Sequence, residues 1–291
     1  MNRDPKHVKF KNKQNPNAAF DLVNIEELFS RKNSEHSYDQ LHLVEFYIII
    51  FIENGHGVHT IDFTDYPCET ATLLTIRKDQ IHRFFKSDKL KGSLLLFTTE
   101  FLVSYLEDLE TQKSLQLFNE LLGAPKIQLS KAAFDEVFQL INRIKREYFD
   151  ISDDFSLGII RSELHILINK LYRIKSQREQ LVSNKKYLPE FIAFQNLVEK
   201  NANKTTKVYD YAKIMGLSTK TLNTITKSMV HKTAKAFVDE ICTKQIKRLL
   251  INTEYSIKEI AYISGFEETS NFYKYFKRQT KVTPEQFRAT F

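Results

Sequence analysis

The chain has 291 residues, enough for two domains with sizeable cores, and a formal net charge of +7. Its two cysteines give neither a disulfide framework nor a cysteine-based zinc motif, so we expect a reducing, cytoplasmic setting. Residues 1–20 are polar and lysine-rich, which argues against a signal peptide, and the longest apolar run, residues 46–52, is too short to span a membrane.

The positive charge is concentrated toward the C-terminal end. Residues 190–291 contain 17 Lys and Arg against 10 Asp and Glu, whereas the rest of the chain carries 26 of each sign. A basic domain joined to a neutral one is typical of proteins that bind nucleic acid phosphates. An anionic membrane is the competing partner, but the sequence has no basic amphipathic helix with an exposed apolar face.

The N-terminal part is expected to be rich in strands. Residues 1–40 form a polar arm with a short strand near residues 18–23 and a helical piece near residues 25–29. Segments rich in β-branched and aromatic residues, separated by turn residues, follow at 41–51, 57–63, 70–76 and 94–97. Several short strands at close spacing predict a small barrel or sandwich.

Histidines in this strand region raise the question of a metal site; they are His42, His56, His59 and His82. Metal-binding barrels use a compact His-x-His followed by a carboxylate, whereas His56 and His59 are three residues apart near a turn. We therefore expect no metal and no cofactor. A small barrel can still enclose one small molecule, so we expect a pocket whose occupant the sequence does not identify.

Helices are predicted after the strands. The first, residues 100–122, ends before Gly123, and the second begins at Ser130 as its N-cap. The third, residues 155 to about 182, carries apolar residues alternately three and four apart, with only Arg178 breaking the series: Leu157, Ile160, Leu164, Leu167, Leu171, Ile174 and Leu181. This coiled-coil-like seam predicts a homodimer interface, and packing of the helix on the barrel is the alternative.

A polar linker is predicted within residues 176–186, which divides the chain into domains 1–183 and 184–291. A helix that ends at Gly216 and a second one capped by Ser218 predict a first helix-turn-helix unit at about residues 207–230. The spacing from Ala212 to Gly216 recurs from Ala261 to Gly265, so the unit is repeated. A long helix, residues 236–251, is expected to join the two units.

The second unit, at about residues 256–280, has the clearest local signals. Ser256 and Glu259 form a capping box, and Gly265 is a stop for the helix that they begin. A further helix from about residue 268 to residue 279 turns its aromatic residues inward and leaves a polar, basic outer face. The second helix of such a unit is the usual reader of the DNA groove.

The C-terminal residues resemble the AraC family of bacterial transcription regulators. The family pattern stands here as Ile257, Ile260-Ala261, Gly265-Phe266, Phe272, Phe276-Lys277, Thr283-Pro284 and Phe287-Arg288. The chain departs from it at His231 and Lys281, where the family usually has Gly, and a non-glycine residue at Lys281 implies a strained turn or a different one. Residues 42–85, with His59, Asp62-Phe63 and Tyr66, look like the cupin-type effector barrel of many members.

The resemblance implies a two-domain α+β chain: a cupin-like β-barrel with flanking helices, followed by an all-α domain with two helix-turn-helix units. It implies an effector-responsive transcription activator, not an enzyme, that binds double-stranded DNA as a homodimer and works with RNA polymerase. The alternatives are an architectural or repressor DNA binder without an effector and a metal-dependent cupin enzyme.

Site residues follow from the same resemblance. Base contacts are expected from residues whose positions match those that the family uses, and Asn and Lys suit adenine and guanine: Lys220, Asn223, Thr224, Thr269, Ser270 and Lys274. Phosphate contacts are expected from nearby cations: Lys227, Lys244, Lys247, Lys277 and Arg278.

Overall fold

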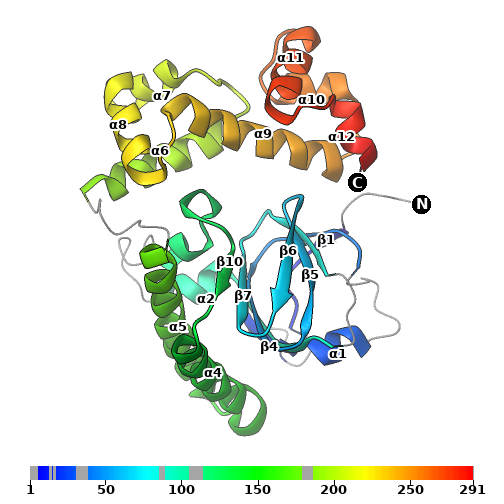
Figure 1. The fold of residues 1–291 in the computed structure, drawn as a ribbon, viewed down its shortest axis with the longest axis vertical. Helices are drawn as coiled ribbons and strands as arrows, with labels where there is room; N and C mark the ends of the chain where they lie inside the picture. The colour runs from blue at the N-terminus through cyan, green and yellow to red at the C-terminus, as the bar shows by residue number, and fades with distance from the viewer. Residues whose placement is uncertain are drawn as a thin grey trace. The chain divides into compact units, whose positions relative to one another are not determined.

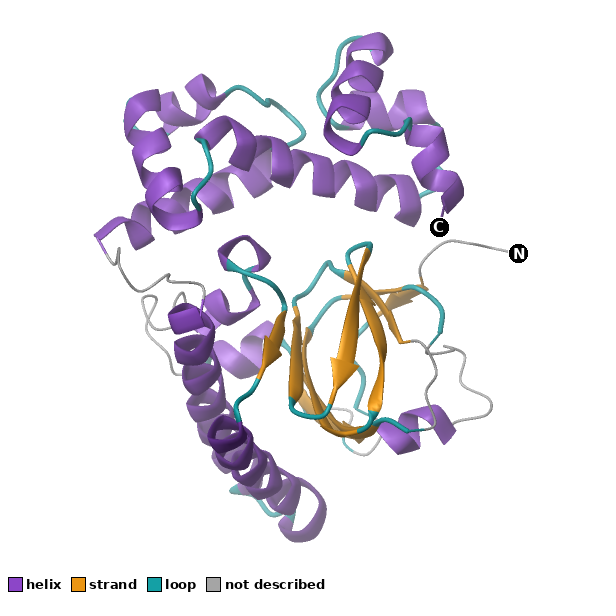
Figure 2. Cartoon of the chain, in the orientation of Figure 1, coloured by secondary structure: helices purple, strands orange, loops and turns teal. Residues whose placement is uncertain are grey.

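The computed structural model describes residues 6–12, 15, 18–30, 39–84, 89–104, 114–178 and 186–290. The chain forms two compact units that divide between Glu179 and Gln180. The predicted boundary at residues 183 and 184 lies outside the described residues. In the described parts, strands occur only in the N-terminal unit, and the C-terminal unit is helical (Figure 2).

Two sheets build the N-terminal unit (Figure 1). The first has the strand order β1 (Lys6–Val8), β3 (His42–Val44), β8 (Ile81–Phe84), β5 (His56–Ile61) and β6 (Thr64–Glu69). The second has the order β10 (Lys126–Gln128), β7 (Thr72–Ile76), β4 (Tyr47–Asn54), β9 (Lys91–Phe97) and β2 (Phe20–Asn24). Within the described residues all the pairings are antiparallel except that of β1 with β3. The predicted strand-rich domain is confirmed.

Strand β4 shows how the apolar run at residues 46–52 is used. Successive side chains of a strand point to opposite faces. Tyr47, Ile49 and Phe51 belong to the core under the helices, whereas Ile48, Ile50 and Ile52 belong to the core between the two sheets. Both faces of this central strand are therefore buried, which explains its continuous rather than alternating hydrophobicity.

The segment after the sheets differs from the single helix predicted at residues 100–122. Helix α2 (Thr99–Val103) ends at Ser104, whose ψ of 127° is not helical, and two short 3-10 turns, η1 (Gln116–Phe118) and η2 (Glu120–Leu122), follow. Asn119 is extended between them, and its side chain accepts a hydrogen bond from the backbone of Leu121. Residues 105–113 lie outside the described residues, but the rest is enough to make the single-helix prediction wrong.

Helix α4 (Lys131–Arg146) begins at the predicted N-cap Ser130 and runs into a π-helical turn, η3 (Glu147–Ile151). Helix α5 (Ser156–Arg178) follows, and the short helix α1 (Ile25–Ser30) lies near the start of the unit. Both α4 and α5 pack against the second sheet through one shared apolar core.

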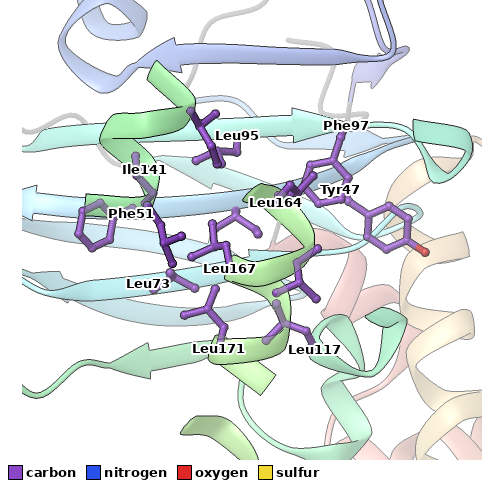
Figure 3. Close-up of a cluster of buried hydrophobic side chains, with 14 of the residues drawn as sticks. Tyr47, Phe51, Leu73, Leu95, Phe97, Leu117, Ile141, Leu164, Leu167 and Leu171 are labelled. Atoms are coloured by element: carbon purple, nitrogen blue, oxygen red, sulfur yellow. The ribbon is translucent and has the colours of Figure 1, made fainter. Parts of the chain in front are cut away.

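The predicted dimer seam on α5 is corrected by this packing. Leu164, Leu167 and Leu171 point at side chains of the second sheet (Figure 3) and have no exposed surface. Ile160 is buried beside them, and Leu157 and Ile174 are half-buried against the same core, while Leu181 lies outside the described residues. The seam therefore holds the helix on the sheet, as the alternative interpretation had it, and is not available to a second copy.

The C-terminal unit consists of helices in chain order. They are α6 (Leu188–Asn201), α7 (Val208–Ile214), α8 (Thr219–Val230), α9 (Ala234–Asn252), α10 (Ile257–Ile263), α11 (Thr269–Thr280) and α12 (Pro284–Thr290). The predicted all-helical domain with two helix-turn-helix units is confirmed. Across the described residues of both units, no helix has the length and hydropathy needed to cross a membrane.

Candidate nucleic-acid interface

The first helix-turn-helix unit consists of α7 and α8. Gly216, with a φ of 65°, makes the turn, and Ser218 caps α8 by accepting a hydrogen bond of 3.0 Å from the backbone N–H of Thr221. Leu222, Ile225 and Met229 are buried and fix the inner face of α8. The opposite face of α8, which includes Lys220, Thr224 and Lys227, is therefore exposed to solvent.

The second unit, α10 and α11, is built in the same way. The predicted capping box is present: the Ser256 side chain accepts from the Glu259 backbone, and a Glu259 carboxylate oxygen accepts from the Ser256 backbone N–H at 2.7 Å. Hydrogen bonds from Ser256 hold the pKa of Glu259 below its usual value. Phe272, Tyr275 and Phe276 are the buried anchors of α11.

The outer faces of α8 and α11 match position by position. Lys220, Thr224 and Lys227 are exposed on α8, and Ser270, Lys274 and Lys277 are exposed on α11, each 50 residues further along the chain. Residues at i, i+4 and i+7 share one face of a helix, so each reader helix carries one polar stripe with a cation at its C-terminal end. Thr269, which begins α11, is half-buried.

The two units also end alike, with residues whose conformation is unusual for their type. His231 caps α8 and Lys281 caps α11, and both are left-handed, with φ of 55° and 69°. The strained turn expected at Lys281 is present, and His231 shares it, because both side chains carry a Cβ that disfavours this region.

One predicted base-contact residue also has an internal role. The Asn223 amide nitrogen donates to the Thr219 carbonyl at 3.0 Å, and its oxygen accepts from the Ala234 backbone N–H at 2.9 Å. Both ends of the amide are used within the domain, where they join α8 to the first turn of α9. These bonds give Asn223 a role in positioning α8, and its pairing with adenine stays a prediction.

The predicted phosphate contacts fall into two groups. Lys227 and Lys277 are exposed on the reader helices, and so is Arg278, whose guanidinium lies 5.5 Å from the centre of the Tyr275 ring. Lys244 and Lys247 lie on α9 and are half-buried: the Lys244 ammonium is 3.7 Å from the Glu240 carboxylate, and that of Lys247 lies 5.2 Å from the Phe287 ring centre. The cations of the first group are thus better placed for DNA.

A polar junction centred on the buried residues Asp239 and Tyr275, which sequence reasoning did not find, connects the two helix-turn-helix units. Asp239 of α9 is 7% exposed, and its Oδ1 accepts from the Tyr275 hydroxyl at 3.0 Å and from the Lys235 ammonium at 2.6 Å. The same ammonium donates to the Thr206 carbonyl at 3.0 Å, just before α7. Burial above all raises the pKa of Tyr275, so its hydroxyl stays protonated and donates.

The turn of the second unit adds a backbone contact to this junction. Gly265 has a φ of 81°, and a Cβ built on it would lie 2.6 Å from the Asn203 carbonyl oxygen of the segment between α6 and α7. Only glycine allows this approach. The junction residues, Lys235, Asp239, Tyr275, Gly265 and the segment 203–206, therefore hold the two helix-turn-helix units in one fixed relation. An aspartate at a buried position of α9 was the available sequence signal.

Comparison with known proteins agrees with this architecture. Residues 25–154 match the family model for an AraC-like ligand binding domain, and residues 211–290 match that for a helix-turn-helix domain. The chain belongs to the AraC family of transcription regulators. In this family member, the first match covers most of the two sheets, and the second spans both reader helices.

Similar proteins were found over most of the chain. The HTH-type transcriptional activator RhaS of Enterobacter sp. (strain 638) is 21% identical over 254 residues, which cover 85% of this chain and 86% of that protein. The HTH-type transcriptional activator RhaR of Mannheimia succiniciproducens is 22% identical over 274 residues, 86% of this chain and 87% of that protein. Among solved structures, ToxT of Vibrio cholerae is 13% identical over 93% of this chain and 98% of its own, with a TM-score of 0.41.

Proposed function

We propose that this AraC-family regulator is an effector-responsive activator whose two reader helices enter successive major-groove segments of double-stranded DNA. The observation that carries the proposal is the matched polar stripe on α8 and α11. The net positive charge of the C-terminal domain supports it. The similar proteins RhaS and RhaR are transcriptional activators, which supports activation over repression. The protein would act in the cytoplasm, together with RNA polymerase.

Roles within the interface follow from position. We assign base contacts to the exposed polar residues of the two stripes and the start of α11: Lys220, Thr224, Thr269, Ser270 and Lys274. We assign phosphate contacts to the cations at the ends of the stripes: Lys227, Lys277 and Arg278. Base contacts create sequence preference, whereas phosphate contacts add affinity for any sequence.

The experiment is DNA binding measured by fluorescence anisotropy, on a duplex selected from a random pool and on an unrelated duplex, at several salt concentrations. Lys274→Ala should lower the affinity for the selected duplex by about 5- to 100-fold and leave the unrelated duplex nearly unchanged. Lys277→Ala should weaken both and reduce the salt slope by about one. Lys131→Ala, an exposed lysine of the N-terminal unit, is the matched control. Equal losses for Lys274→Ala on both duplexes would refute the assignment.

Homodimerisation is proposed through a different face from the predicted seam. Phe155, which immediately precedes α5, is 75% exposed, and Ile159 and Ile166 on the outer side of α5 are 42% and 43% exposed. Large apolar side chains that lie together on a surface are typical of protein interfaces. Ile159→Glu with Ile166→Glu should yield monomers in sedimentation velocity runs and leave the far-UV circular dichroism spectrum unchanged. Wild-type protein that sediments as a monomer at micromolar concentration would contradict the proposal.

An architectural DNA binder without an effector is the second candidate. The two functions differ in one measurement, because the affinity of an architectural binder for its selected duplex should not change with any small molecule that the N-terminal unit binds.

A further inference from the structure

Three histidines form a row across the inner face of the first sheet. His42 on β3 lies opposite His82 on β8 in the strand register, and His59 on β5 is two residues from Ile61, which lies opposite His82. Residues two apart on a strand face the same side, so all three imidazoles share one face. Their ring centres are 5.9 Å apart for His42 and His82 and 5.2 Å apart for His59 and His82.

These imidazoles are buried, and two of them have ring nitrogens without a hydrogen-bond partner among the described residues. His42 and His82 are each 7% exposed, and His59 is fully buried. Among the described residues, both ring nitrogens of His59 are without a hydrogen-bond partner. The same holds for the Nδ1 of His82. A neutral imidazole still carries one N–H donor and one acceptor nitrogen, and buried groups of this kind are nearly always paired. His59 and His82 thus offer hydrogen bonds that the described residues do not use.

A cavity that is partly open to the surface lies next to the row, between the two sheets. It has a volume of about 140 Å³ and is lined by His42 and His82 together with apolar side chains that include Phe46, Phe84, Leu94 and Leu96. The two histidines are the only polar side chains in the lining. A cavity of about 150 Å³ with purely apolar walls holds a molecule of the size of benzene. The present cavity has that size and, in addition, one polar wall.

We propose that this cavity binds an uncharged monocyclic molecule of about the size of phenol, whose single hydroxyl or carbonyl group hydrogen-bonds with His42 and His82. The inference names the chemical class of the effector and therefore rests on the proposed function. Its ring would lie against the apolar lining, and its polar group would pair with the imidazole wall.

The charge of the ligand follows from the state of the histidines. Burial, together with the neighbouring imidazoles, lowers the pKa of His59 to about 3 and that of His82 well below its usual value, so these two imidazoles are neutral at pH 7. A carboxylate in this cavity would be a buried charge without a counter-charge, which is costly. A hydroxyl or carbonyl group needs only the hydrogen bonds that neutral imidazoles give.

A metal ion is the competing occupant of a histidine cluster. Within the described residues, no three His, Cys, Asp or Glu side chains are arranged to hold one. The organic ligand is therefore the class that the geometry favours, and zinc becomes an outcome of the test.

The experiment is isothermal titration calorimetry of the full-length protein with phenol, benzene, benzoate and zinc sulfate at pH 7.5. Phenol should bind at one site, and benzene should bind about 2- to 10-fold more weakly because it lacks the hydrogen bond. Benzoate should bind most weakly of the three. His82→Phe should remove the preference for phenol over benzene, and His42→Gln, which keeps a hydrogen-bonding side chain, should retain part of it. His56→Gln, at an exposed position of the same sheet, is the control.

Four results would overturn the inference: benzene binding as tightly as phenol, benzoate binding most tightly, zinc binding that His82→Phe abolishes, or no binding of any aromatic probe by a folded protein. A DNA-binding assay with and without phenol separates this inference from the proposed function. If phenol binds but DNA affinity does not change, the cavity assignment stands and the effector response fails. If a polar sugar changes DNA affinity while phenol does not bind, the effector response stands and the cavity assignment fails.

Discussion

Replacing Tyr275 by Phe removes one hydroxyl from the junction and keeps the aromatic ring. The hydroxyl lies 3.0 Å from Oδ1 of Asp239, which is 7% exposed, so its loss leaves a buried carboxylate with one donor fewer. A hydrogen bond to a charged group contributes about 1.5–3 kcal/mol. The ammonium of Lys235 remains 2.6 Å away, so we expect the lower end of this range, about 1.5 kcal/mol.

The assay is urea denaturation of the full chain, followed by far-UV circular dichroism. Tyr273→Phe is the matched control, since Tyr273 is on the same helix and donates its hydroxyl to the exposed carboxylate of Glu285. Loss of such a surface interaction should cost less than about 0.5 kcal/mol. The two variants should also differ in DNA binding. Tyr275→Phe should weaken binding to a duplex that contains the major-groove segments for both reader helices more than binding to a duplex with only one of these segments (a half-site). The reason is that the substitution loosens the contact between the two helix-turn-helix units.

The reasoning would be refuted by a Tyr275→Phe variant within about 0.5 kcal/mol of the wild type, or by equal losses in the two variants. Unchanged preference for the duplex with both half-sites would refute the positioning role alone, and the junction would then contribute only to stability.

Three further predictions concern strain and burial. His231→Gly and Lys281→Gly should each raise the free energy of unfolding by about 0.5–1 kcal/mol, since relief of a left-handed residue exceeds the entropic cost of glycine; no gain in urea denaturation would contradict this. Gly265→Ala should lower it by more than about 2 kcal/mol, because the new Cβ meets the Asn203 carbonyl oxygen at 2.6 Å; a melting temperature equal to that of the wild type would count against the close contact. His59 has a folded pKa of about 3 against 6.5 in the unfolded chain, so the unfolded state alone gains a proton as the pH falls below 6.5. His59 alone should therefore lower stability by about 2 kcal/mol between pH 7 and pH 5, and His59→Gln should reduce the pH dependence in denaturation curves by that amount.

Local signals explain why the C-terminal units could be predicted from the sequence. The capping box of Ser256 and Glu259 and the turn at Gly265 each depend on residues within a few positions of one another. The N-terminal hairpin was harder, because the turn between β5 and β6 uses Asp62 and Phe63 with φ of 44° and 69°. Phenylalanine is not typical of such a turn, so the sequence pattern predicted one continuous strand over residues 57–63.

Long-range contacts explain what the sequence could not decide. The periodicity of α5 shows which face is apolar, but not whether a sheet or a second helix covers it, and the second sheet does. Asn223 is a suitable reader of adenine by type, yet its amide is used by the backbone of Ala234, eleven residues away. The contact between Asp239 and Tyr275 joins residues 36 positions apart and depends on the packing of three helices.

The junction limits the way in which an effector can act on DNA binding. Tyr275, Asp239, Lys235 and the close contact at Gly265 fix the two reader helices relative to each other within the C-terminal unit. A ligand bound among the strands of the N-terminal unit can shift an equilibrium only between states that it binds differently. Because these contacts join the two helix-turn-helix units, we propose that an effector acts on dimerisation or on the presentation of the whole DNA-binding unit, and not on the spacing between the reader helices.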